Sequence, residues 1–363
     1  MCDWEVVMKI EFDKPIKLKT SRAWRTYLGG KMIDKLHDVD GEDNNFPEEW
    51  LMSTVCARNA GREDIVEGIS FVDGTDITLK DLIDKNPYEM LGKEYAEATN
   101  NSIGVLVKLL DSAERLTVQV HPTKVKAKEL FDSEYGKTEC WHIVDVREIN
   151  GIKPSIFLGF KEGITREHWM ECFEKQDIPE MLSCLNEIEV KPGDTYIVNG
   201  GVPHAIGCGC FLVEIQEPTD YTIRTERVTP SGLKVADFMC HQGLGFEKMF
   251  DCFSYDGYSE AEVIEKWRVV PVKNVYDGYT VENIIYPKIT DMFAFDMVEV
   301  EKECKIEKGK FSCIYVMEGT GTINGKELNK CDHYFIPFSS EEVLIKNIGS
   351  EKLKFIRCFG KEI

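Results

Sequence analysis

Residues 116–122 read Leu-Thr-Val-Gln-Val-His-Pro, an alternation of apolar and polar side chains that predicts a β-strand. Successive side chains of a strand point to opposite faces, so the three apolar residues share one face. The other face carries Thr117, Gln119 and His121. A face with an alcohol, an amide and an imidazole does not suit an ordinary core, and we interpret it as the wall of a site.

Two other segments add donors of the same kind. Glu139 follows Gly136-Lys137-Thr138, and His204 follows Pro203. Together with the strand at residues 116–122, they supply two imidazoles, one carboxylate and one amide oxygen. This set suits a single divalent metal with positions left open for a substrate. The predicted ligands are Gln119, His121, Glu139 and His204.

The composition excludes several classes of function. A net charge of −20 argues against nucleic acids and anionic membranes, whose phosphates a protein must neutralise. The acidic first residues do not resemble a secretory signal, and no run reaches the eighteen or so apolar residues of a membrane span. Thirteen cysteines without a regular framework indicate reduced thiols and a cytoplasmic protein. A small phosphorylated substrate remains compatible if a local basic cluster binds it.

Helical signals interrupt a chain that is otherwise rich in strand signals. The pattern predicts helices over residues 123–135, 165–174 and 177–185. Thr78 is a predicted helix cap, and Ser259-x-x-Glu262 is a capping box that opens a helix to about residue 267. After residue 287 the pattern predicts a succession of short strands separated by turns.

A short internal echo suggests a duplicated β-barrel unit. Residues 194–198 (Asp-Thr-Tyr-Ile-Val) align with residues 332–336 (Asp-His-Tyr-Phe-Ile). Ten residues after the first aspartate comes His204, whereas the same position in the second copy is Glu342. We therefore expect metal chemistry in the first copy only.

Six segments in the same order resemble the type I mannose-6-phosphate isomerases of the cupin superfamily, in their short bacterial form. They lie between about residues 20 and 230, at 104–111, 116–122, 136–141, 200–206, 213–217 and 222–224. The resemblance implies a mainly β fold of two cupin (jelly-roll) barrels with a small helical insertion at about 163–187. It implies an N-terminal catalytic, metal-binding domain at 1–270 and a C-terminal barrel without metal at 271–363.

The resemblance also implies a reaction, the interconversion of D-mannose 6-phosphate and D-fructose 6-phosphate through an enediol(ate) intermediate. One Zn²⁺ per chain is expected, and other divalent metals are compatible. The family's metal ligands fall on the four positions predicted above. Its characteristic lysine falls on Lys137, its arginine on Arg224 and an intervening acid on Glu214.

These residues suit the chemistry of the expected reaction. The reaction moves a proton between C1 and C2, and Glu214 is favoured over Lys137 as the base that takes it. A dianionic phosphate needs cations and alcohol donors, and the candidates are Lys108, Thr117, Lys137 and Arg224. Arg224 is also a candidate for the catalytic step itself.

Plainer interpretations stay open for single residues. Lys108 could extend from an apolar strand to solvent, and Arg224 could pair with Asp220 or Glu226. His37, His142, His168, His241 and His333 are interpreted as surface or structural residues, and the cysteines at 140, 208 and 210 mainly as buried thiols.

Two other functions compete with the isomerase. One is a different metal-dependent cupin enzyme such as a dioxygenase, and the other is a non-catalytic cupin that binds sugar phosphates. The dioxygenase hypothesis assigns no function to Lys137 and Arg224. The expected oligomeric state is a monomer or a homodimer.

Overall fold

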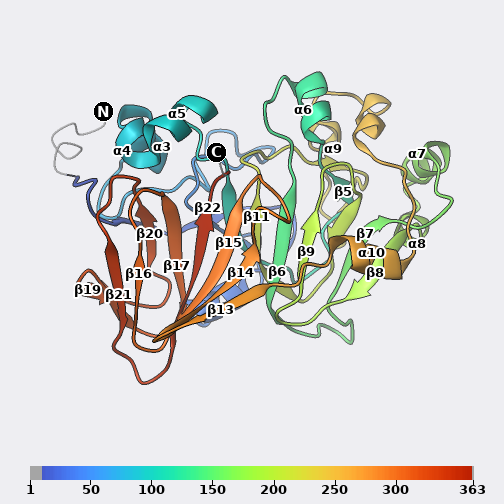
Figure 1. The fold of residues 1–363 in the computed structure, drawn as a ribbon. Helices are drawn as coiled ribbons and strands as arrows, with labels where there is room; N and C mark the ends of the chain where they lie inside the picture. Colours follow the sequence, from blue (N-terminus) through green and yellow to red (C-terminus); the bar gives the residue numbers. More distant parts are fainter. Residues whose placement is uncertain (1–9, 362–363) are drawn as a thin grey trace.

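The computed structural model describes residues 10–361, and antiparallel strands in four sheets dominate it (Figure 1). The prediction of a mainly β fold is confirmed. In Figure 1 the orange and red C-terminal strands gather on one side, and the green and yellow strands of the N-terminal half lie on the other. The division into two cupin barrels at about residue 270 stays a prediction.

A six-stranded sheet lies in the middle of the molecule. Its strands, in spatial order, are β2 (Ser21–Ala23), β3 (Glu48–Leu51), β4 (Leu106–Asp111), β11 (Cys210–Gln216), β6 (Glu139–Val146) and β9 (Thr195–Val198). Strand β11 is buried along its whole length, because β4 and β6 flank it and both of its faces are covered. On one face Val213 and Ile215 join a core cluster with Phe295 and Ile356 of the C-terminal strands.

The other face of this sheet carries polar side chains in register. Glu214 lies opposite Lys108 of β4, and Gln216 lies opposite Glu139 of β6. Alternation along β11 therefore separates an apolar face toward the C-terminal half from a polar face toward the site.

A five-stranded sheet belongs to the N-terminal half. Its spatial order is β12 (Ile223–Arg224), β5 (Gln119–Val120), β10 (His204–Ile206), β7 (Ser155–Phe160) and β8 (Leu185–Glu189). Gln119 is paired with His204 on one side and with Arg224 on the other. Three predicted site residues, distant in sequence, thus lie side by side on neighbouring strands.

Two sheets make up the C-terminal half. The larger has seven strands in the order β1 (Ile16–Leu18), β20 (His333–Ile336), β17 (Ser312–Glu318), β22 (Leu353–Phe359), β15 (Ala294–Val300), β14 (Tyr279–Ile285) and β13 (Val272–Tyr276). The smaller contains β16 (Glu303–Ile306), β21 (Val343–Asn347), β18 (Gly321–Ile323) and β19 (Lys326–Leu328). The N-terminal strand β1 pairs with β20 and so contributes to a sheet of C-terminal strands.

The two echoed segments occupy equivalent positions. Residues 195–198 form β9, which pairs with β6, and residues 333–336 form β20, which pairs with β17. In the first copy β6 begins with Glu139, whereas β17 begins with Ser312.

Helices fill the connections, and they are α2 (Lys31–Leu36), α3 (Leu79–Lys85), α4 (Pro87–Leu91), α5 (Lys93–Thr99), α6 (Lys124–Phe131), α7 (Arg166–Lys175), α8 (Ile178–Ser183), α9 (Asp237–His241), the 3₁₀ turn η1 (Lys248–Cys252) and α10 (Glu260–Trp267). Thr78 and Ser259 cap helices as predicted, and Thr165 caps α7 in the same way. Among the described helices, none has the length and apolar character that crossing a membrane requires.

One helix is shorter than predicted. The helix expected to reach residue 135 ends at Phe131, because Asp132 adopts the left-handed conformation with φ of 51°. Aspartate tolerates this conformation better than most residues, and it stops the helix one turn early.

Candidate active site

Three predicted metal ligands meet where the six-stranded and five-stranded sheets face each other. Glu139 is the first residue of β6, His204 the first of β10, and His121 follows directly after β5. All three side chains are buried. Residues at the ends of strands are held in place by the sheet, and this fixes the positions of the three donor side chains.

The donor atoms of these residues surround one point. His121 Nε2 lies 3.2 Å from His204 Nε2 and 3.2 Å from Glu139 Oε2. His204 Nε2 lies 3.5 Å from Glu139 Oε1. Two imidazole nitrogens at roughly 2.0–2.1 Å from a tetrahedral zinc would be about 3.3 Å apart. The observed separations therefore fit one zinc-sized cation.

Hydrogen bonds prepare both imidazoles for a cation. His121 Nδ1 donates to the Tyr221 carbonyl at 2.9 Å, and His204 Nδ1 donates to the Val202 carbonyl at 2.8 Å. Each bond leaves the Nε2 lone pair directed at the shared point. Glu139 Oε1 is buried without a hydrogen-bond partner, which is costly unless a cation approaches it.

The electrostatics of the site favour the protonation states that bind metal. Burial, together with the Lys137 charge, lowers the pKa of His121 to about 3, and burial also lowers the pKa of His204. Burial opposes ionisation of Glu139, but the Lys137 charge outweighs it and holds the pKa of that carboxyl well below its usual range. Two neutral imidazoles and a carboxylate leave a bound dication with net positive charge.

Gln119 and Lys137 border the same point. The Gln119 amide nitrogen lies 3.3 Å from His204 Nε2, and turning the amide by 180° would present its oxygen instead. The Lys137 ammonium lies 2.8 Å from His121 Nε2 and donates to Glu139 Oε2 at 3.0 Å. Both side chains also line the adjoining cavity.

The cavity brings together every predicted substrate-binding residue. Its walls are formed by residues 25–27, 48, 59, 108, 110, 116, 117, 119, 137, 214, 220, 222, 224, 229 and 239. Among them are the side chains predicted for phosphate and catalysis, namely Lys108, Thr117, Lys137, Glu214 and Arg224. The walls are therefore strongly polar and contain several cations.

Lys108 does not extend to solvent. It is 2% exposed, and its ammonium donates to Glu214 Oε1 at 2.7 Å and to Gln216 Oε1 at 2.8 Å. Burial, together with the Glu139 charge, raises the pKa of Glu214, although Lys108 opposes this rise. Lys108 thus holds the Glu214 carboxylate in a fixed orientation at the cavity wall.

Arg224 is free of the carboxylates that could have occupied it. Its guanidinium donates to the carbonyls of Thr222 and Met239, at 3.3 Å and 2.9 Å. Asp220 pairs with Arg25, and Glu226 pairs with Arg115. The plain ion-pair interpretation of Arg224 is therefore wrong, and its remaining donors are available to an anion in the cavity.

Sequence reasoning missed a buried network on the cavity wall. Arg25 donates to Glu48 at 3.0 Å and to both Asp220 oxygens at 3.0 and 3.3 Å, and Tyr27 donates to Glu48 at 2.7 Å. Arg25 and Asp220 are 195 residues apart, so no local spacing could have joined them. The available signal was the pair of adjacent carboxylates, Glu48 and Glu49, directly before an apolar pair at residues 50–51.

Other histidines have structural partners, as expected. His142 is bonded to Thr195 Oγ1 at 2.8 Å, and His333 Nε2 accepts from the Met52 amide at 3.0 Å. His37 lies 2.8 Å from Glu49. His168 pairs with Glu180 at 3.1 Å and also lies beside two cysteines, away from this site.

Comparisons with known proteins agree with this geometry. Residues 66–139 match the model of the phosphomannose isomerase type I catalytic domain. YvyI of Bacillus subtilis is 27% identical over 252 residues, which is 67% of this chain and 71% of YvyI. The mannose-6-phosphate isomerase of Streptococcus mutans is 30% identical over 214 residues, covering 56% of this chain and 58% of that protein. In sequence, the chain is thus similar to the type I phosphomannose isomerases.

Solved structures show that family's fold along nearly the whole chain. The crystal structure of the mannose 6-phosphate isomerase from Bacillus subtilis superposes with a TM-score of 0.68, at 23% identity over 95% of this chain and 99% of that one. A zinc-bound mannose 6-phosphate isomerase superposes with a TM-score of 0.71, at 16% identity over 96% of this chain and 100% of that one.

Proposed function

We propose that this chain is a metal-dependent mannose-6-phosphate isomerase, interconverting D-mannose 6-phosphate and D-fructose 6-phosphate. The observation that carries the proposal is the shared position of Gln119 and Lys137, which touch the His121–Glu139–His204 cluster and also line the cationic cavity. A metal centre that opens onto cations suits a substrate with both a carbonyl and a phosphate. A cupin dioxygenase would leave those cations without a role.

Zinc is the metal expected at the cluster. His121 Nε2, His204 Nε2 and Glu139 would hold it, with the Gln119 amide oxygen as a fourth, weaker ligand. When bound, it supplies Lewis acidity to the carbonyl and hydroxyl oxygens at C1 and C2 of the open-chain sugar. An amide oxygen is a poor zinc ligand, so looser selectivity among divalent metals follows.

We assign the proton transfer between C1 and C2 to Glu214. Its carboxylate lies on the cavity wall in an orientation fixed by Lys108, and burial raises its pKa toward the working range of a general base. Lys137 contacts Glu139 and His121, so it is assigned instead to the sugar oxygens or the phosphate.

Arg224, Lys137 and Thr117 form the proposed anion subsite. Arginine offers a planar fork for phosphate, lysine a point charge, and threonine a hydroxyl. The free space of the cavity is about 40 Å³, far below the roughly 300 Å³ of common ligand pockets. Binding a hexose phosphate therefore requires the cavity to widen.

Glu214→Gln tests the assignment of the base. The variant should keep its metal and its KM for mannose 6-phosphate and lose at least 100-fold in kcat, on the scale of a removed general base (about 10²–10⁴). Lys137→Met is the comparison variant, for which KM should rise more than kcat falls. Near wild-type turnover by Glu214→Gln would move the base to Lys137.

We propose the cellular compartment from the cysteines and the partners from the composition. The abundance of unpaired thiols supports a reducing cytoplasm. The strongly acidic composition supports the absence of nucleic acid and membrane partners. The proposed assembly is a monomer or a homodimer.

A further inference from the structure

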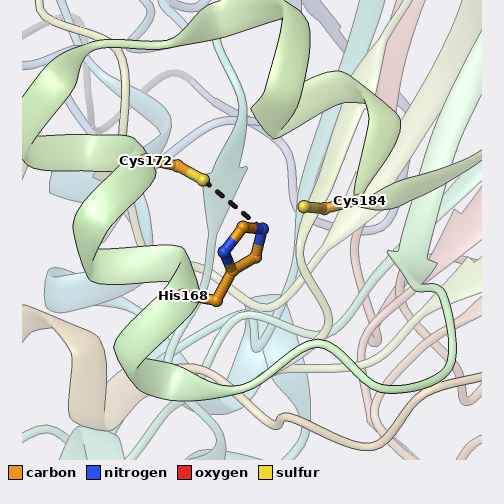
Figure 2. Close-up of side chains that lie close together, drawn as sticks. All are labelled: His168, Cys172 and Cys184. Atoms are coloured by element: carbon orange, nitrogen blue, oxygen red, sulfur yellow. Dashed lines mark hydrogen bonds between the residues drawn. The ribbon is translucent and has the colours of Figure 1, made fainter.

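A second group of metal-binding residue types lies in the helical insertion, outside the candidate active site. His168 and Cys172 are four residues apart on α7, so both side chains leave the same face of the helix. Cys184 caps the C-terminal end of α8. Figure 2 shows the His168 imidazole between the two sulfur atoms, with all three side chains directed into one space.

The distances within this group suit one cation. The two sulfurs and one imidazole nitrogen all lie within 4.8 Å of one another. Cys172 Sγ is 3.7 Å from His168 Nε2. A tetrahedral zinc with bonds of about 2.3 Å to sulfur and about 2.0 Å to nitrogen separates these atoms by about 3.6 Å. The helices therefore hold the group close to the spacing that coordination requires.

A carboxylate on α8 could serve as a fourth metal ligand. Glu180 Oε1 lies 3.1 Å from His168 Nε2. The cysteines are buried, at 3% and 2% exposure, while the side chains of His168 and Glu180 are 40% and 47% exposed. A cation could thus enter from solvent on the imidazole side and bind the thiolates inside.

The surrounding charges are negative. Burial raises the pKa of Cys172, and the charges of Glu180, Asp177 and Glu171 raise it further. Burial raises the pKa of Cys184 to about 11. Both thiols therefore stay protonated in the absence of a cation, and binding a cation would displace their protons into solvent.

We propose that His168, Cys172 and Cys184 form a second divalent-cation site, suited to Zn²⁺, with the Glu180 carboxylate as fourth ligand. Two thiolates and one imidazole are soft donors that favour zinc over calcium or magnesium. Four protein ligands leave no open position, so the site is structural. It joins α7, α8 and the start of β8, and it does not depend on the proposed isomerase activity.

Binding of Co²⁺ distinguishes this site from the candidate active site by its spectrum. Thiolate bound to Co²⁺ gives a sulfur-to-metal charge-transfer band in the near ultraviolet, and the His121–Glu139–His204 cluster contains no thiolate. The full-length His204→Ala variant, reduced and titrated with Co²⁺, should develop this band with one equivalent bound. The same variant with Cys172→Ala and Cys184→Ala added should not.

Zinc content of the full-length protein gives the second measurement. After loading and desalting, the wild type should retain two equivalents, and Cys184→Ala should retain one with mannose 6-phosphate turnover intact. Cys252→Ala is the matched control, since Cys252 is an equally buried thiol of the same core cluster. It should retain two equivalents.

Three results would overturn the proposal. The first is a His204→Ala protein that binds neither Co²⁺ nor Zn²⁺. The second is a charge-transfer band that survives removal of both cysteines. The third is a Cys172–Cys184 disulfide, found by mass spectrometry of protein isolated without reductant, that persists while zinc is offered in excess.

Discussion

At the scale of single residues, the direction of two imidazole rings suits the candidate cluster to a metal ion. Backbone carbonyls hold Nδ1 of His121 and His204, so the Nε2 lone pair of each ring is directed at the shared point. Loss of one ring should remove one of the three strong donors around the shared point.

His204→Ala should therefore abolish both tight metal binding at this cluster and turnover. His142→Ala is the matched control, because it removes another buried imidazole from the six-stranded sheet, one bonded to Thr195. Elemental analysis with a turnover assay checks both variants. Equal metal loss from both would mean that general unfolding, and not ligand loss, is responsible.

Arg224→Ala should lose about 2–3 kcal/mol of transition-state stabilisation, the scale of a removed hydrogen bond to a charged group. If the guanidinium binds phosphate, KM for mannose 6-phosphate should rise first; if it acts on the developing charge at C1 and C2, kcat should fall. Arg227→Ala, an exposed cation stacked on Phe173 and Phe246, is the control. Wild-type kinetics for Arg224→Ala with intact metal content would remove it from the site.

The sequence could predict the site residues that share a motif. Gln119 and His121 alternate on one segment, so local periodicity exposed them. Glu139 was found by its donor chemistry, and Lys137 through the family resemblance of residues 136–141. Arg25 and Asp220 meet only through the pairing of sheets, and periodicity carries no such information. His168 and Cys172 had a helical spacing of four that could have been noticed, whereas Cys184 joins them only because α8 turns back.

At the scale of secondary-structure elements, the sequence predicted whether a segment is a helix or a strand better than it predicted where the element ends. The caps at Thr78, Thr165 and Ser259 placed three helix starts, because their side chains satisfy free backbone amides. The end of α6 at Phe131 depends on the conformation of Asp132, which composition does not determine. The alternation at residues 116–122 gave the right faces, although only two residues are paired as β5.

Strand β20 carries a pH-sensitive contact between the two halves. His333 accepts a hydrogen bond from Met52, and burial lowers its pKa from 6.5 to about 4. The unfolded chain binds this proton more readily, so the contribution is complete above pH 6.5 and is lost as the pH falls toward 4. The loss amounts to about 3 kcal/mol of unfolding free energy.

His333→Gln, which keeps an acceptor for the Met52 amide, should therefore flatten the acid limb of stability. Urea unfolding of wild type and variant between pH 7 and pH 4 measures the effect. Parallel curves for the two proteins would show that His333 does not titrate on unfolding in this range.

At the scale of the whole molecule, the six-stranded sheet serves both halves. Its apolar face packs against the C-terminal strands and its polar face holds the site, so the C-terminal half supports the site from behind. The echo between residues 194–198 and 332–336 foretold equivalent strands in the two halves. It could not foretell that β1 pairs with β20, because a three-residue strand carries little pattern.

Metal removal should destabilise the molecule as a whole. The cluster joins strands of two sheets, and a cation that binds only the folded chain stabilises it by about 2.7 kcal/mol at a hundredfold excess over Kd. Thermal unfolding of zinc-loaded and chelator-treated protein should show a lower Tm for the latter, with recovery on adding zinc. The His204→Ala variant should show a smaller shift, and an equal shift would place the stabilising cation elsewhere.

We propose that the metal cluster and the cationic cavity act together as a mannose-6-phosphate isomerase. Mixing purified, zinc-loaded protein with mannose 6-phosphate and following fructose 6-phosphate tests this directly. We expect steady formation of fructose 6-phosphate, which stops on chelation, resumes when zinc is restored, and is absent for His204→Ala. A folded protein with zinc bound at the cluster that forms no fructose 6-phosphate would contradict it.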